Sequence, residues 1–229
     1  MRWSLADLHV HTTCSDGQPT PEALAERLAR SGLAVVAVTD HDTIEGALRV
    51  EEALAGRGPE IVVGSEVSSA DGHVLALFVA RDVPAGRSAG ATIAAIHAQG
   101  GLAIAAHPYS LALGVGDLAA RLPFDAIEMR NGSPLMGLPN RRAPRRLRRA
   151  GAALVGGSDA HVAGAVGGVA TLFPGTCAAD LRAAVVARLT RPAGDAAVRL
   201  AAWPPHLAWL ARLTLFRTAQ RSGPVGTPT

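Results

Sequence analysis

Side chains that commonly bind metal ions recur in short groups along this chain. His9 and His11 stand one residue apart in the stretch DLHVHTTCSDG (7–17), and Asp16 closes that stretch before a glycine. Residues of the same types follow at Asp40, His41, Asp42, Glu66, His73, His107, Asp159 and His161. Neutral imidazole suits Zn, Mn and Fe, and carboxylates can bridge two metals. Six histidines and several acids exceed the needs of one four-coordinate metal, so we expect two to three divalent metal ions (Mn, Fe or Zn).

Short apolar runs precede most of these groups and are candidate strands. They lie at 5–10, 34–40, 60–66, 73–79, 102–108, 125–131 and 152–159. Strands that alternate with helices are typical of a mostly parallel sheet, and seven candidates favour a barrel over an open sheet. Residues at the carboxyl ends of barrel strands converge on one mouth, where active sites of such barrels lie. The side chains at these ends are therefore expected to meet.

Segments of helical period separate several of the strands. They lie at 20–32, 43–58, 88–101, 138–151 and 177–192. Thr20 is placed to cap the first of them, with Pro21 at the first helical position and Gly32 as its stop. The connection between Glu66 and His73 is too short for a helix and predicts a hairpin.

Two closely spaced metals would clamp a phosphoryl group and generate hydroxide at neutral pH, without a protein nucleophile. Alternation along a strand lets His9 and His11 face the mouth together. Asp40 and Asp42 are expected to orient imidazoles rather than to bind metal. Structural roles are expected for His97 and His206, and Cys14 is left out of the ligand set.

Composition fits one domain of ordinary size with an apolar core. The chain has 229 residues, of which 48% are hydrophobic, and a formal net charge of +3. Much of the positive charge lies in an arginine run at 140–151, which is expected to be a solvated helix face, with a phosphate-rich partner as the alternative. Two cysteines, no apparent signal peptide and no apolar stretch long enough to span a membrane predict a cytoplasmic protein.

The segment from 192 onward differs from the rest of the chain. It holds two of the three tryptophans in WPPHLAWLARLTLFRTAQ and ends in a polar, Pro/Gly-rich stretch. We therefore expect a barrel over 1–191 and a C-terminal extension over 192–229, with a helix from roughly 205 to 220 and a frayed tail. Packing on the barrel is the first expectation for its apolar face, and a homodimer contact or a membrane surface are the alternatives.

The ordered motifs resemble the PHP family, named for polymerase and histidinol phosphatase. They are DLHVHTTCSDG, then VTDHDT, then GSEVS, then HP at 107–108 and GSDAH at 157–161, with GAVGGVATLF following. The resemblance implies a distorted seven-stranded (β/α)7 barrel with a trinuclear metal site at its mouth. It also implies a metal-dependent phosphoesterase acting on small phosphomonoesters or nucleotides.

The family resemblance implies a ligand set for each metal. One metal would take His9, His11, Glu66 and Asp159; a second would share Glu66 and add His73 and His107; a third would take Asp16, His41 and His161. Glu66 would then be a bridging carboxylate. The spacing between His107 and Asp159 is shorter than in the nucleoside-bisphosphate phosphatases of the family, which argues against a nucleotide substrate.

The expected reaction is hydrolysis of a small phosphate ester by a metal-activated hydroxide. Glu66 and Asp159 are the expected catalytic residues at the metals, and Arg130 is expected to hold phosphate or to form a salt bridge on the rim. A 5′-3′ exonuclease or phosphodiesterase acting on short oligonucleotides is one alternative, with the arginine run as a phosphate track. A non-catalytic module whose metals only staple the fold is the other.

Overall fold

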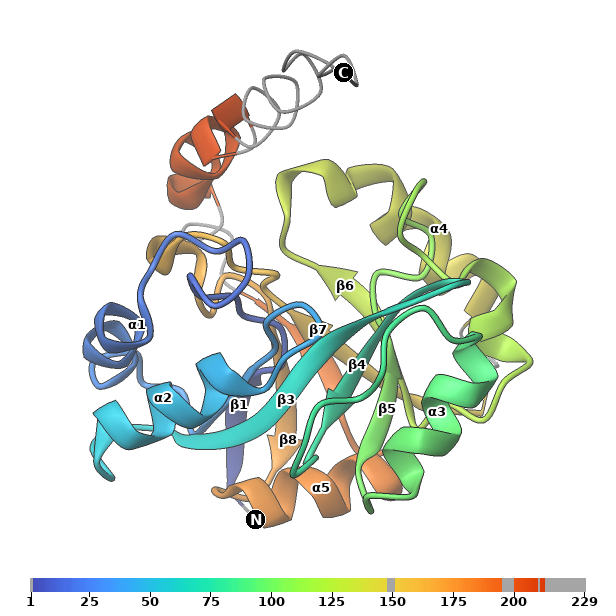
Figure 1. Ribbon diagram of the computed structural model, residues 1–229, viewed down its shortest axis with the longest axis horizontal. Helices are drawn as coiled ribbons and strands as arrows, with labels where there is room; N and C mark the ends of the chain where they lie inside the picture. Colours follow the sequence, from blue (N-terminus) through green and yellow to red (C-terminus); the bar gives the residue numbers. More distant parts are fainter. Residues whose placement is uncertain (1, 148–150, 195–199, 210, 213–229) are drawn as a thin grey trace, which may run out of the picture.

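The protein is a mixed α/β fold built around one nine-stranded sheet (Figure 1). The computed structural model describes residues 2–147, 151–194, 200–209 and 211–212. The strands are β1 (Trp3–Asp7), β2 (Val35–Val38), β3 (Glu60–Ser69), β4 (Gly72–Leu77), β5 (Leu102–Ala105), β6 (Ala126–Asn131), β7 (Ala153–Gly157), β8 (Ala170–Pro174) and β9 (Arg191–Ala193). Their order in the sheet is β7-β6-β5-β4-β3-β2-β1-β8-β9.

The two ends of this sheet approach each other, so the sheet is a nearly closed barrel. Across the gap, Gly156 N of β7 donates a hydrogen bond to Thr171 Oγ1 of β8 (2.9 Å). Next to it, Thr190 Oγ1 donates to the Leu154 carbonyl at 2.9 Å. These contacts bring the last strands against β7, although no ladder joins them among the described residues.

All seven predicted strands exist, but the sheet has two further strands, so the predicted count of seven does not describe it. The predicted hairpin is present, because β3 and β4 pair antiparallel with Glu66 opposite Leu75. The pairs β4–β5, β1–β8 and β8–β9 are antiparallel too, whereas β1–β2, β2–β3, β5–β6 and β6–β7 are parallel. The sheet is thus evenly mixed rather than mostly parallel.

Helices accompany the strands along the described residues up to 194 (Figure 1). They are α1 (Pro21–Leu28), α2 (Glu45–Leu54), α3 (Ala89–His97), α4 (Gly137–Leu147) and α5 (Ala178–Val186). Helix α5 lies across the end of the barrel near the N-terminus, where Leu181 joins the cluster of apolar side chains in the interior. Short 3-10 turns at Gly116–Ala120, Pro134–Met136 and Ala163–Ala165 complete the connections. Thr20 caps α1 as predicted, since its side chain accepts from Ala23 N at 3.2 Å and Pro21 opens the helix.

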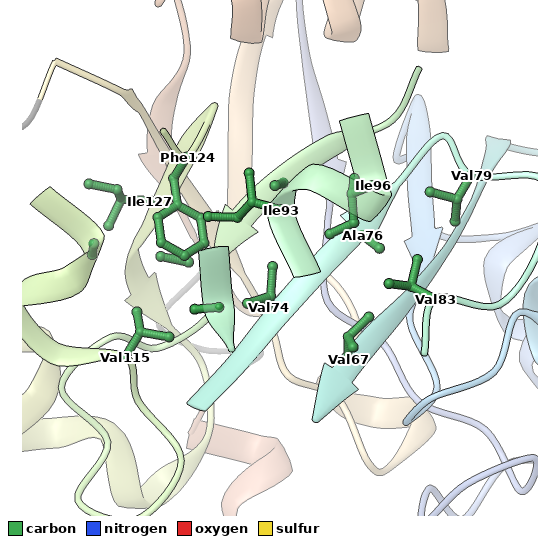
Figure 2. Close-up of a cluster of buried hydrophobic side chains, with 14 of the residues drawn as sticks. Val67, Val74, Ala76, Val79, Val83, Ile93, Ile96, Val115, Phe124 and Ile127 are labelled. Carbon is green, nitrogen blue, oxygen red and sulfur yellow. The ribbon is translucent and has the colours of Figure 1, made fainter. Parts of the chain in front are cut away.

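Apolar side chains fill the barrel and the layer between sheet and helices. Figure 2 shows the cluster under α3, where Ile93 and Ile96 pack on Val74 and Ala76 of β4. A second cluster fills the inside of the barrel and includes Phe173 of β8. This packing holds the strands rigidly enough to fix the loops at their ends.

A further helix spans 200–209 and lies at the end of the molecule away from the N-terminus (Figure 1). It begins about five residues earlier than predicted and includes the two prolines; most of the predicted stretch beyond 209 lies outside the described residues. Ala202 and Trp209 pack in one cluster with Val10 and Val162, so this helix covers the barrel. None of the described helices is both long and apolar enough to cross a membrane.

Gly46 lets α2 approach the turn that carries Asp40. A Cβ built at Gly46 would lie 1.8 Å from Asp40 Oδ2 and 2.7 Å from Thr12 Oγ1. The same Asp40 carboxylate accepts from Thr12 N (2.7 Å) and from Ser15 Oγ (2.6 Å). Gly46 is therefore needed to hold the loop after β1 in place.

Replacing Gly46 by Ala should lower the free energy of unfolding by about 1–3 kcal/mol, because the new methyl overlaps Asp40. Thermal unfolding of the purified variant measures this as a lower Tm. Gly137→Ala is the matched control, since a Cβ there meets nothing within 4 Å. An unchanged Tm for Gly46→Ala would contradict the close approach.

Candidate metal centre

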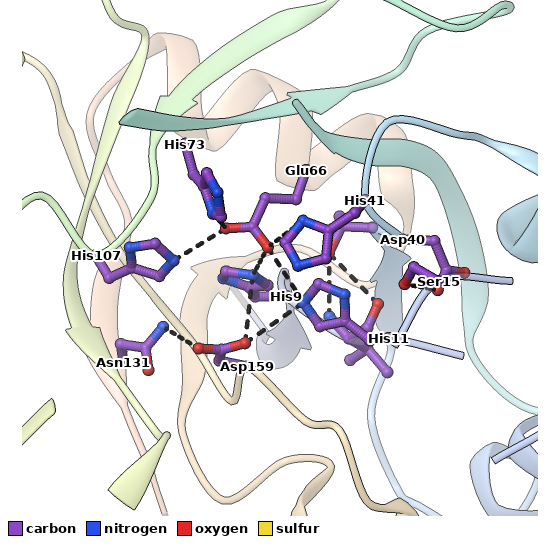
Figure 3. Close-up of polar contacts among 12 residues, drawn as sticks. His9, His11, Ser15, Asp40, His41, Glu66, His73, His107, Asn131 and Asp159 are labelled. Carbon is purple, nitrogen blue, oxygen red and sulfur yellow. Dashed lines mark hydrogen bonds and ion pairs between the residues drawn. The ribbon is translucent and has the colours of Figure 1, made fainter. Parts of the chain in front are cut away.

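The predicted ligand residues converge at one end of the barrel (Figure 3). They come from the loop after β1 (His9, His11, Asp16), the loop after β2 (His41), strands β3 and β4 (Glu66, His73), and the segments after β5 and β7 (His107, Asp159, His161). Most are buried, whereas Asp16 and His41 are half-buried and face the opening. Nine residues spread over more than 150 positions thus share one site.

Glu66 lies at the centre of this group and is almost fully buried. Its two carboxylate oxygens face different imidazoles. Oε1 lies 2.8 Å from His73 Nδ1 and 2.9 Å from His107 Nε2, whereas Oε2 lies 3.1 Å from His9 Nε2, 3.3 Å from His11 Nε2 and 3.5 Å from His41 Nδ1. One carboxylate is therefore divided between two sets of nitrogen donors.

Asp16 and Asp159 complete the acidic part of the site. Asp16 Oδ1 lies 3.1 Å from His161 Nε2 and 3.7 Å from His41 Nε2. Asp159 Oδ1 lies 3.4 Å from both His11 Nε2 and His161 Nδ1, and 3.6 Å from His9 Nε2. Asp16 and Asp159 thus stand on two sides of the pair His11 and His161, whose rings stack with centroids 4.2 Å apart.

These donors fit divalent metal ions. Four sets of potential ligand atoms each lie within 4.8 Å of one another: His11, Asp16, His41 and His161; His9, His11 and Glu66; His9, His107 and Asp159; and His41, Glu66 and His73. Several buried polar atoms in these sets have no hydrogen-bond partner, among them both ring nitrogens of His11 and Asp16 Oδ1. Buried polar atoms are normally satisfied, and a cation would satisfy these.

Charge pairing inside the site shifts the pKa values of its members. Burial opposes protonation of His9 and His11, but the carboxylates of Glu66 and Asp159 outweigh it; they raise the pKa of His9 well above its usual value and the pKa of His11 to about 9. Burial likewise opposes ionisation of Glu66 and Asp159, yet the surrounding imidazoles hold the pKa of both carboxyls well below the usual range. His161 and its neighbours lower the pKa of Asp16 to about 2 against the effect of burial.

Glu128 of β6 supports the site and was not predicted. Its Oε1 lies 3.1 Å from His9 Nδ1, while Oε2 accepts from His107 N (2.8 Å) and from Asn131 Nδ2 (3.0 Å). Asn131 Nδ2 also donates to Asp159 Oδ2 at 3.2 Å. A buried acid that binds the far nitrogen of a ligand histidine fixes the ring and its tautomer.

Asp40 and Asp42, predicted to orient imidazoles, do not hydrogen-bond to any imidazole described. Asp40 binds the loop after β1, and Asp42 Oδ1 accepts from Ser68 N at 2.7 Å. Both acids therefore shape the backbone that carries the ligands. His97 is outside the site as predicted, because its Nε2 lies 2.8 Å from Asp125 Oδ2 on the outer surface.

Three residues at the mouth have a left-handed backbone without being glycine. Asp42, His107 and Asp159 have φ angles of 58°, 25° and 52°. L-residues adopt this region at a cost, and such residues cluster at functional sites. At His107 and Asp159 the sharp turn directly follows a strand and directs the side chain into the barrel mouth.

An open cavity of about 560 Å³ lies over the centre. Its floor consists of predicted ligand residues, and its walls include Leu113, Leu135, Met136 and Trp209. No arginine lines it among the residues that the structure describes, and Arg130, predicted to hold phosphate, is not at this cavity. A β-bulge between Glu128 and Arg130 shifts the register of β6, and it is Glu128 and Asn131 that reach the site.

The described part of the arginine run, 140–147, lies on α4 and does not line the cavity, whereas Arg148 and Arg149 lie outside the described residues. Arg141, Arg142, Arg145 and Arg146 are exposed, while Ala143 and Leu147 face the core. Arg142 stacks over the ring of Tyr109 at 5.0 Å. This distribution matches the predicted solvated helix face.

Sequence comparisons relate the chain to the PHP family. The family model for the PHP domain matches residues 7–113, and the model for a PHP-associated segment matches residues 137–190. An uncharacterized protein of Methanocaldococcus jannaschii is 37% identical over 147 residues, which cover 59% of this chain and 86% of that protein.

Shorter matches occur to proteins with named activities. A phosphoribosyl 1,2-cyclic phosphate 1,2-diphosphodiesterase of Eggerthella lenta is 39% identical over 87 residues, which cover 35% of this chain and 33% of that protein. A 5′-3′ exoribonuclease of Haemophilus influenzae is 43% identical over 63 residues, which cover 28% of this chain and 23% of that protein. The chain thus spans a third or less of these two relatives.

Solved structures share the fold. A two-domain protein of Bacteroides vulgatus, described as containing a predicted PHP-like metal-dependent phosphoesterase, aligns with a TM-score of 0.71 at 18% identity; the alignment covers 84% of this chain and 65% of that one. PsfC of Pseudomonas syringae aligns with a TM-score of 0.68 at 21% identity and covers 96% of this chain and 100% of that one.

Metal affinity should rise with pH between about pH 6 and 8. The raised pKa of His11, about 9, keeps its imidazole protonated at neutral pH, so a bound cation must displace that proton. At pH values below this pKa, each unit by which the pH rises tightens metal binding about tenfold for each proton displaced. Titrating the metal-free protein with Mn²⁺ by calorimetry, in buffers of different ionisation enthalpy, measures both affinity and proton release. An affinity that is constant over this range would contradict the charge state derived for the site.

Replacing Glu128 by Gln should weaken metal binding by about 10–100-fold, because the variant keeps the size of the side chain but removes the charge that orients His9. Equilibrium dialysis against Mn²⁺ measures the effect. Glu52→Gln, an exposed position on α2, is the control. Equal affinity in both variants would show that Glu128 does not support the ligands.

Proposed function

The chain belongs to the PHP family of metal-dependent phosphoesterases, and we propose that it hydrolyses a small phosphate ester at a centre of two to three divalent metal ions. The observation that carries this proposal is the position of Glu66. Its two oxygens lie against separate sets of imidazoles on the floor of an open cavity. A carboxylate in this position can bridge two metals.

The proposed ligand sets are those that the family resemblance implies. One ion would be held by His9, His11, Glu66 and Asp159, a second by Glu66, His73 and His107, and a third by Asp16, His41 and His161. The last three side chains fall within one set of mutually close donors, which also includes His11. Mn, Fe and Zn all accept these nitrogen and oxygen donors.

Divalent ions at such a centre activate a water molecule as the nucleophile and offset the charge of the phosphoryl group. The protein residues set up this chemistry by position. Glu66 and Asp159 supply buried negative charge that holds cations at the floor of the cavity. Asn131 and Glu128 fix Asp159 and His9 from behind, so that the donors stay aligned.

The cavity favours a small substrate. A volume of about 560 Å³ lies within the usual range for small-molecule sites, about 300–1,000 Å³. Leu113, Leu135 and Met136 form an apolar wall that would contact the organic part of an ester. Since no arginine lines the described cavity, the phosphate would be neutralised by the metals.

A 5′-3′ exonuclease or phosphodiesterase acting on short oligonucleotides is the second candidate. The local identity to the Haemophilus influenzae exoribonuclease and to the Eggerthella lenta diphosphodiesterase favours it. The exposed positions of Arg141, Arg142, Arg145 and Arg146 on α4 argue against a phosphate track that leads into the cavity. Cleavage of an oligonucleotide that weakens steeply from 50 to 200 mM salt would favour this candidate over a small ester.

A non-catalytic module whose metals only stabilise the fold would tolerate the loss of some ligand residues, or a centre that substrate cannot reach. The nine ligand positions are all filled with donor residues, and the cavity above them is open. Both features support an enzyme.

Replacing Glu66 by Gln should reduce turnover by more than about 100-fold, because an amide cannot supply the charge that a bridging ligand needs. The test reconstitutes the metal-free protein with Mn, Fe or Zn. It then screens phosphorylated metabolites and short oligonucleotides, and measures turnover and metal content of the variant. Glu52→Gln, exposed on α2, is the control. Full turnover together with full metal content in Glu66→Gln would rule out the bridging role.

A further inference from the structure

The C-terminal helix (200–209) returns to the mouth of the barrel, beyond both segments matched by the family models. Its buried side chains Ala202, His206 and Trp209 are spaced by four and three residues and therefore share one face. Trp203 and Leu207 lie on the exposed side. The buried face points at the metal centre, since Trp209 is one of the residues that line the cavity.

Trp209 contacts two of the proposed ligands directly. Its indole Nε1–H donates a hydrogen bond of 2.7 Å to the Asp16 carbonyl. Its ring lies on the His161 imidazole, with centroids 4.0 Å apart and planes tilted by 34°. His206 packs beside both, with its ring centroid 5.6 Å from Trp209 and 5.7 Å from His161.

These contacts are confined to one part of the centre. Asp16 and His161 belong to the donor set that also holds His11 and His41, and the Asp16 carboxylate lies 3.1 Å from His161 Nε2. Glu66 makes its hydrogen bonds with other imidazoles, those of His9, His73 and His107. A change at Trp209 thus acts first on the donor set that holds Asp16 and His161, and it can reach the Glu66-centred set only through His11 and Asp159, which lie against His161.

The loop that carries Asp16 is held by several other hydrogen bonds, among them Ser15 Oγ to Asp40 Oδ1 (2.6 Å) and Thr13 N to the Pro19 carbonyl (2.9 Å). Inside the loop, Gly17 N donates to the Thr12 carbonyl (2.9 Å), and Gln18 N donates to the His161 carbonyl (2.9 Å). Asp16 itself is half-buried and faces the opening. The hydrogen bond from Trp209 therefore fixes the backbone at the ligand itself.

We propose that Trp209 is a positioning residue for the metal site formed by Asp16, His41 and His161, and that the C-terminal helix thereby determines the occupancy of this site alone. The inference rests on the proposed metal centre. The indole N–H fixes the backbone of Asp16, and the ring restricts the rotation of His161, so both donors are pre-organised before an ion arrives. Glu66, His73 and His107 form their polar contacts with one another rather than with the helix.

The test starts from metal-free wild type, Trp209→Ala and Trp209→Phe. Each protein is titrated with Mn²⁺, and the number of bound ions and their affinities are measured. We expect Trp209→Ala to bind one ion about 10–100-fold more weakly while the other sites keep their affinity. Trp209→Phe keeps the ring against His161 and loses only the indole N–H, so it should recover part of this affinity. Leu207→Ala, exposed on the same helix, is the matched control and should bind as the wild type does.

A second readout follows the indole directly. Paramagnetic Mn²⁺ bound at the adjacent site should quench the emission of Trp209 in the wild type, and Trp209→Phe, which keeps Trp3 and Trp203, should lose that quenching step. Thermal unfolding of the metal-free proteins monitors the fold. If Trp209→Ala lowers the Tm, the inference is tested by the Mn²⁺ binding of Trp209→Phe alone.

The inference is overturned if Trp209→Ala and Trp209→Phe bind Mn²⁺ with wild-type stoichiometry and affinity, if all sites weaken equally, or if the wild type shows no quenching. A failure of the proposed function would give a different result. A wild type that binds Mn²⁺ but cleaves no phosphate ester would contradict the proposed function. The loss of one ion in Trp209→Ala would still support the role of the helix.

Discussion

The architecture of the mouth depends on one buried carboxylate, that of Glu66. Removing a carboxylate from water is costly unless opposite charge and hydrogen bonds surround it. Here five imidazoles from four parts of the chain supply that environment. The hairpin of β3 and β4 places His73 next to Glu66, and the neighbouring strands carry the others. The order of strands in the sheet can thus be understood as the arrangement that assembles this group.

The convergence of the predicted ligand residues could be predicted because their positions follow from a local rule. A donor that comes just after a candidate strand, as His107 and Asp159 do, lies at a strand end, and strand ends of a barrel meet. Glu66 fits this rule only in part, since it lies inside β3, which continues to Ser69. Strand β9 escaped prediction because it has only three residues, Arg191–Ala193, with a central proline that is unusual in strands.

The remaining features could not be predicted because they depend on the packed structure. Glu128 lies inside an apolar strand, where only the tertiary fold shows that it faces His9. Arg130, two residues on, was predicted to reach the site, but a β-bulge lies between them and Asn131 extends to Asp159 instead. Trp209 meets Asp16 across 193 residues of sequence. No local pattern records such a contact.

The left-handed turns at Asp42, His107 and Asp159 have a thermodynamic consequence. Each such residue costs on the order of 1–3 kcal/mol, and a domain of ordinary size has only about 5–15 kcal/mol of net stability. The packing of the barrel must therefore supply enough free energy of folding to offset the backbone cost of these three residues at the mouth. Cations that bind only the folded chain would return part of that free energy by mass action. On the proposed assignment, the lifetime of this protein in its surroundings is tied to how much metal those surroundings supply.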